Sequence, residues 1–128
     1  MNYEQRIKNL SVPEGKIDVI IDTDTYNEID DQFAVSYLLK SSDKLNTKAI
    51  YAAPFLNANS ISPADGMEKS YNEILKLLDL AEEKVDVFKG SDSFLKNETT
   101  PVVSAAAKDL AERVKNYSPS NPLYIVAI

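Results

Sequence analysis

The chain has 128 residues and contains neither cysteine nor histidine. Without cysteine there is no disulfide and no thiolate chemistry, which fits a reducing, cytoplasmic setting. Without histidine, a Ser-His-Asp triad and histidine metal ligands are excluded within this chain. The ligands that remain are hard oxygens, which suit calcium or magnesium better than zinc or copper.

Positive charge is also scarce, since the chain has 14 Lys and Arg residues against 20 Asp and Glu residues, which gives a formal net charge of −6. Nucleic acids and anionic membranes both need a basic surface, so neither is expected as a partner. No apolar run approaches the length that spans a bilayer, and the polar N-terminal stretch does not resemble a signal peptide. A cation or a neutral small molecule stays open as a ligand.

The remaining composition, 44% apolar and 27% charged, is that of one small domain with a real core. Apolar runs and helical patterns alternate along it, and residues 1–15 form a leader with one helical turn. We expect strands at 16–21, 47–53, 85–88 and 123–128, and helices at 30–40, 66–81 and 101–117. This order predicts an α/β fold with an open, parallel, Rossmann-like sheet and flanking helices.

Apolar stripes at helical spacing indicate which side of each helix faces the sheet. In the first helix we expect Phe33, Ala34, Tyr37 and Leu38 to point inward. In the second and third helices the expected inward residues are Met67, Tyr71, Ile74, Leu75, Leu78, Val103, Ala106, Ala107, Leu110 and Val114.

The last residues, 123–128, form the most apolar predicted strand, with no polar segment after it. A complete α/β domain would normally cover such a strand. We therefore expect residues 1–128 to be a single α/β unit and the front part of a longer domain, truncated after strand four.

Five carboxylates gather at the end of the first predicted strand without a Lys or Arg among them: Asp22, Asp24, Glu28, Asp30 and Asp31. Two unit charges about 4 Å apart repel by roughly 1–4 kcal/mol. A bound cation, a raised carboxylate pKa or a helix N-terminus would offset that repulsion. Ligands of open α/β sheets sit outside the carboxyl ends of the strands, where this loop, residues 54–65 and the loop after Gly90 are expected to converge.

Asp and Asn after a strand also serve as turn formers and helix caps. Capping needs one carboxylate, whereas Asp22, Asp24, Asp30 and Asp31 supply four. For Asn27 a turn and a supporting contact in a site are both open, and Glu28 is as consistent with a solvated loop charge as with a ligand.

The motif Asp22-Thr23-Asp24, followed by Asp30-Asp31 at the start of a helix, resembles that of the inosine-uridine nucleoside hydrolase family. The spacer of residues 25–29 is longer than the common Pro-Gly form and looks like an Asn-Glu-containing subgroup. Residues 52–57, 69–75, 87–91 and 122–128 are similar to later stretches of the family, so the likeness spans nearly the whole chain.

This resemblance implies hydrolysis of the N-glycosidic bond of a nucleoside, with calcium as cofactor. By position, Asp24 matches a calcium ligand and general base, and Asp31 a bidentate calcium ligand. Asp30 matches an acceptor of ribose hydroxyls, Asn57 a ribose contact, and Asp22 a buried supporting carboxylate.

The family's remaining calcium ligands and its leaving-group acid would lie beyond Ile128. The resemblance therefore implies a partial site, and we expect this chain alone to be inactive. Full-length members are commonly homo-oligomers, so self-association is implied for the full-length protein.

Two other readings stay open. The stretch Asp22-Thr23-Asp24-Thr25 also fits a haloacid-dehalogenase-type phosphatase, with Asp22 as nucleophile, Asp24 as acid/base and magnesium as cofactor. Alternatively, the chain is a non-catalytic fragment or a subunit that needs a complementary segment, with exposed apolar surface beside residues 123–128. An EF-hand is excluded because the acidic stretch has no glycine and follows a strand.

Overall fold

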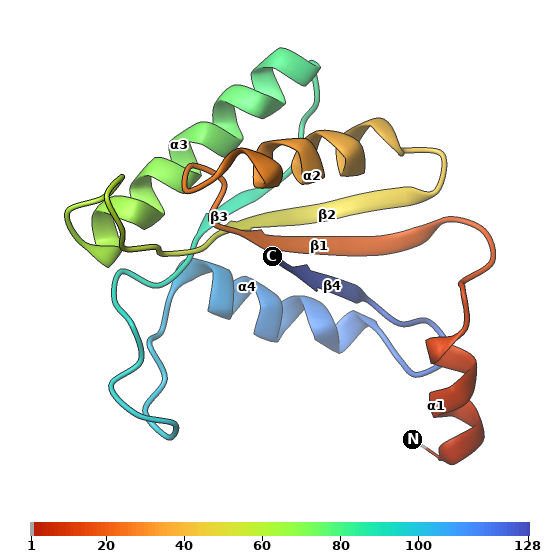
Figure 1. The fold of residues 1–128 in the computed structure, drawn as a ribbon. Coiled ribbons are helices and arrows are strands. Elements are labelled where there is room, and N and C mark those ends of the chain that lie inside the picture. The colour runs from red at the N-terminus through yellow and green to blue at the C-terminus, as the bar shows by residue number, and fades with distance from the viewer. Residues whose placement is uncertain (1) are drawn as a thin grey trace.

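A computed structural model describes residues 2–128 of the chain. Its four strands form one parallel sheet in the order β3-β2-β1-β4, with helices on both faces (Figure 1), which confirms the α/β fold. The elements are α1 (Tyr3–Leu10), β1 (Ile17–Thr23), α2 (Ile29–Lys40), β2 (Leu45–Ala52), α3 (Pro63–Ala81), β3 (Val87–Lys89), α4 (Ala105–Arg113), η1 (Val114–Asn116) and β4 (Tyr124–Ala127).

Strand β1 lies inside the sheet, between β2 and β4. Its consecutive residues Val19, Ile20 and Ile21 are all buried, because successive side chains of a strand point to opposite faces and both faces are covered. The hydrogen-bonded part of the strand runs on through Asp22 to Thr23. This extension carries the acidic motif to the carboxyl edge of the sheet.

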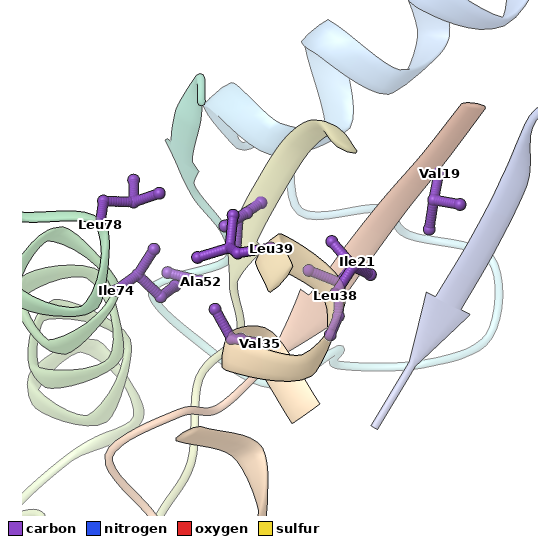
Figure 2. Packing of buried hydrophobic residues seen from close by; sticks show 9 residues of the cluster. Val19, Ile21, Val35, Leu38, Leu39, Ala52, Ile74 and Leu78 are labelled. Atoms are coloured by element: carbon purple, nitrogen blue, oxygen red, sulfur yellow. The ribbon is translucent and has the colours of Figure 1, made fainter. Parts of the chain in front are cut away.

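Each face of the sheet has its own core. On one face Val19 and Ile21 of β1 pack with Val35 and Leu39 of α2 and Ile74 of α3 (Figure 2). On the other face Ile20 packs with Ala49 and Tyr51 of β2 and with Ala106 of α4. Among the described residues, no helix is long and apolar enough to cross a membrane.

The side of α2 that faces the sheet differs from the prediction. Asp31, Val35, Leu38 and Leu39 are buried, whereas Phe33 and Tyr37 are exposed. Both stripes have helical spacing, and they lie on opposite sides of the same helix. The helix is apolar nearly all round, so periodicity alone did not select the buried side.

Two other predicted helices also differ from the structure. The third begins at Ala105 instead of 101, because Ser104 caps it by accepting a hydrogen bond from the Ala107 N–H at 3.1 Å. Val103, Ala107 and Val114, expected inward, are exposed, and so is Leu75 of α3. Helix α3 begins earlier than predicted, at Pro63, and the N-terminal helix α1 is longer than the single turn expected.

Strand β4 forms one edge of the sheet and pairs only with β1 among the described residues. Ile125, Val126 and Ile128 are exposed there. The edge therefore presents apolar side chains together with unpaired backbone groups.

Gly66 of α3 lets the loop after β2 pack directly against the helix. A Cβ on Gly66 would collide with the backbone of Phe55, including its nitrogen at 2.8 Å. The loop that follows β2 is thereby held against the first turns of α3, beside the carboxyl edge of the sheet.

We predict that Gly66→Ala destabilises the protein by about 2 kcal/mol or more, because backbone cannot move aside as a flexible side chain can. Gly15→Ala is the matched control. Its Cβ would meet nothing within 4 Å, and only its φ of +78° is strained, which costs about 1 kcal/mol. Chemical denaturation measures both, and an equal or larger loss for Gly15→Ala would contradict the packing described for Gly66.

Candidate metal and ribose site

The candidate site lies at the carboxyl edge of the sheet, where β1 ends and α2 begins. Residues 24–28 connect these two elements, and residues 53–62 connect β2 to α3. The two loops are hydrogen-bonded to each other through Asn27, Asn57 and Asn59. The third loop starts beside them, since the Gly90 N–H donates to the Ala52 carbonyl at 2.9 Å. The expected convergence at one edge is therefore present in the structure.

Asp24 and Asp31 face each other at this edge, within hydrogen-bonding reach. Burial, followed by the hydrogen bond and the charge of Asp31, raises the pKa of Asp24 from 3.8 to about 6. Glu28 also raises this pKa, and Asn27 lowers it. Within residues 2–128 neither carboxylate forms an ion pair with a Lys or Arg.

Two buried threonines hold Asp31 in place. The Thr23 hydroxyl donates to Asp31 Oδ2 at 3.0 Å and lies 2.9 Å from the Thr25 hydroxyl. A hydroxyl has only one proton to donate, so Thr25 is the donor to Thr23. Asp31 also sits in the first turn of α2, where the helix dipole favours an anion. The sequence did not indicate a role for either threonine. The alternation of Asp22, Thr23, Asp24 and Thr25 is nevertheless typical of a strand, in which the two threonines point to the same side.

Asn27 is the hydrogen-bonding centre of the two loops. Its side-chain N–H₂ donates to Asp24 Oδ2 at 3.0 Å, and its backbone N–H donates to the Asp24 carbonyl at 2.7 Å. Its side-chain oxygen accepts from Asn57, and its backbone carbonyl accepts from Asn59 at 3.0 Å. Asn27 therefore holds one oxygen of Asp24 while tying the second loop to the first.

The predicted ribose contact Asn57 is exposed, but its amide is already engaged. Its N–H₂ donates to Asn27, and its oxygen accepts from the Asn59 N–H at 2.8 Å. In this arrangement Asn57 supports the loop pair, and one N–H of its amide stays open toward solvent.

The other acidic residues of the motif make no hydrogen bond to the side chains of Asp24 or Asp31 in the described part of the chain. Asp22 is half-buried in β1, and burial raises the pKa of its carboxyl. Asp30 is exposed on α2 and makes no hydrogen bond or ion pair within the described part of the chain. Glu28 occupies the N-cap position of α2 without a side-chain capping bond.

The Asp24–Asp31 pair fits a hard divalent cation as part of its ligand set. The carboxylates are adjacent and uncompensated, and carboxylate oxygens are what calcium and magnesium take. The next residue, Gln32, has a buried side-chain oxygen without a hydrogen-bond partner in residues 2–128. No group of three or more acidic side chains is placed to hold a metal among those residues. Two carboxylates supply at most four of the roughly six to eight oxygens that calcium takes.

Comparison of the chain with protein-family models, curated proteins and solved structures finds no match.

The raised pKa of Asp24 predicts how stability depends on pH. Folding makes Asp24 hold its proton more tightly, so its contribution to stability is fully present below pH 3.8 and is lost as pH rises to about 6. We expect Asp24→Asn to stabilise the metal-free protein by about 1 kcal/mol at pH 7.5, after allowance for solvent screening. Near pH 3.5 the two proteins should be equally stable.

Thermal unfolding in chelator at both pH values measures this difference. Asp92→Asn, which replaces an exposed carboxylate of the loop after β3 and keeps the oxygen that accepts from Ser93, is the control and should change stability at neither pH. A stabilisation by Asp24→Asn of the same size at both pH values would contradict the repulsion between Asp24 and Asp31.

A second prediction concerns Asn27. Replacing it by alanine frees the Asp24 carboxylate and unties the second loop, so calcium affinity should fall about tenfold, in the range found when a partner of a metal ligand is removed. Asn59→Ala cuts one loop contact but leaves the Asn27–Asp24 bond, and should change affinity by less than threefold or so. Fluorescence competition with a calcium indicator compares them, and equal losses would assign the effect to the loop alone.

Proposed function

We propose that this chain carries the metal- and ribose-binding part of a calcium-dependent nucleoside N-ribohydrolase site. The observation that carries the proposal is the facing, uncompensated pair of Asp24 and Asp31 at the carboxyl end of β1. The resemblance of the acidic motif to the nucleoside hydrolases supports the same assignment.

Asp24 is the proposed general base. A pKa of about 6 leaves it mostly ionised at neutral pH while keeping it a stronger proton acceptor than an ordinary aspartate. Asn27 donates to Oδ2 and makes that oxygen less basic, so Oδ1 is the proposed acceptor of a proton from water. Asp31, fixed by Thr23, is the proposed second metal ligand. Calcium, when bound there, would lower the pKa of a water molecule and fix its position.

The proposed substrate is a nucleoside, whose neutral ribose hydroxyls are donors that carboxylates accept. Asp30 is exposed and free of protein partners in the described residues, so its oxygens are open to such donors. Cleavage of the glycosidic bond builds positive charge on the sugar, and the carboxylates of Asp24 and Asp31, with Glu28 nearby, would stabilise that charge.

The phosphatase alternative is less well supported. Its nucleophile would be Asp22, but that carboxyl is half-buried and burial raises its pKa, which favours the unreactive neutral form. A phosphomonoester is itself an anion, and every charged side chain within residues 22–31 is a carboxylate, which would repel it.

The subunit alternative rests on a different observation. The exposed apolar residues Ile125, Val126 and Ile128 lie on an edge strand that another strand would cover by backbone pairing. This reading is compatible with the ribohydrolase proposal, since a complementary chain would also bring further oxygens to the metal.

Calorimetric titration with calcium tests the metal part of the proposal. We expect measurable but weak binding to the wild-type chain and at least a tenfold loss in Asp31→Asn, which keeps the shape of the residue and the acceptor for Thr23. Asp79→Asn, which replaces an exposed carboxylate of α3, should bind calcium as the wild type does. Equal heats for the wild type and Asp31→Asn would remove the metal site.

The nucleoside part is tested in the same samples with inosine and uridine. Calcium should strengthen nucleoside binding in the wild type, and Asp24→Asn should abolish this effect. Ribose release should be slow or absent with this chain alone, because two carboxylates do not complete the metal ligand set. Phosphate release from p-nitrophenyl phosphate with magnesium, without any effect of nucleosides, would favour the phosphatase instead.

A further inference from the structure

Helix α2 exposes a row of large apolar side chains on the side that faces away from the sheet. Ile29, Phe33 and Tyr37 follow one another at intervals of four residues and are 70%, 69% and 73% exposed. Residues four apart are neighbours on a helix surface, so the three side chains form a continuous ridge along most of α2.

This ridge is not needed for the fold of the described residues. The opposite side of α2 supplies the core contacts, through Val35, Leu38 and Leu39 (Figure 2). Single exposed apolar residues are ordinary on protein surfaces, but a contiguous row that includes two aromatic rings marks an interaction surface.

The charges at the two ends of the ridge indicate what covers it. Asp30 lies at the N-terminal end of the ridge and Lys40 at its C-terminal end. Asp30 precedes Tyr37 by seven residues, and Lys40 follows Phe33 by seven residues. Residues 30, 33, 37 and 40 thus have the alternating spacing of three and four residues that characterises a helix–helix seam. Asp30 and Lys40 are both exposed. The Lys40 ammonium donates one hydrogen bond to the Ala81 carbonyl at 3.3 Å, which leaves two of its three N–H groups for a partner.

We propose that α2 is a self-association surface, on which a second copy of this chain packs its own α2 in the antiparallel direction. Phe33 of each copy then meets Tyr37 of the other, and Asp30 of each meets Lys40 of the other. A twofold arrangement of this kind uses the same patch twice and closes on itself. The antiparallel direction also sets the opposite ends of the two helix dipoles side by side.

The same features disfavour other occupants. A parallel pair would bring Asp30 against Asp30 and Lys40 against Lys40. An anionic membrane would meet Glu28, Asp30 and a chain of net charge −6. The proposal does not depend on the enzymatic one, and a carboxylate accepts several hydrogen bonds, so Asp30 can meet Lys40 and a ribose hydroxyl together.

Sedimentation velocity over a range of concentrations tests the surface. We expect the wild type to reach twice the 14.2 kDa of one chain, and Phe33→Ala to raise the dissociation constant by about 100-fold, because two aromatic contacts are lost per dimer. Leu80→Ala, at an apolar residue of α3 that is 81% exposed, is the control and should leave the constant unchanged. Circular dichroism verifies that the variants fold.

A charge exchange tests the direction of packing. At each end of the proposed interface, Lys40→Glu sets a glutamate of one copy against Asp30 of the other. The repulsion between these carboxylates should weaken association by about tenfold. Adding Asp30→Lys to it reverses both charges and should restore the wild-type constant. Val126→Lys on β4 should have no effect.

A monomer at all concentrations would overturn the proposal. So would a dimer that Val126→Lys dissociates but Phe33→Ala does not, since that would place the second copy on the β4 edge. Failure of the double charge exchange to restore association would overturn the antiparallel arrangement.

Discussion

The repulsion between Asp24 and Asp31 is the constraint on which the carboxyl edge of the sheet depends. Several surrounding features reduce it or hold the two groups in spite of it. Asp31 lies in the first turn of α2 and accepts a hydrogen bond from the Thr23 hydroxyl. Asp24 accepts a hydrogen bond from the side-chain amide of Asn27. Burial, together with the repulsion that is left, raises the pKa of Asp24 to about 6. Neither carboxylate is ion-paired to a Lys or Arg within residues 2–128, and this uncompensated pair is the feature on which the proposed cation site rests.

The neighbouring loop is organised by the same constraint. Asn27 orients Asp24 and accepts hydrogen bonds from Asn57 and Asn59, so the loop after β2 is anchored to the carboxylate that it borders. Gly66 lets the backbone of that loop lie directly against α3. The position of Asp24 is therefore coupled to two loops and a helix, and not to its own loop alone.

The sheet, and the position of the acidic motif at its carboxyl edge, could be predicted from the sequence. The apolar run of β1 and the alternation of elements indicated a parallel sheet, and the density of carboxylates pointed to its carboxyl edge. Other features could not be predicted. Because α2 is apolar on both sides, its spacing did not reveal that Phe33 and Tyr37 face solvent. The hydrogen bond from Thr23 to Asp31 spans eight residues and depends on how the strand meets the helix. The exposure of Asp30 and the engaged amide of Asn57 likewise follow from three-dimensional packing.

The most direct test of the account is to follow the carboxyl carbon of Asp24 by NMR as pH is varied, without and with calcium. The account predicts a pKa of about 6 in chelator, because burial and Asp31 disfavour the charged form. With saturating calcium the pKa should fall below the ordinary value of 3.8, because a cation between the two carboxylates reverses the sign of the local charge. An ordinary pKa in chelator, or one that saturating calcium leaves unchanged, would contradict the claim that this pair is built to hold a divalent ion.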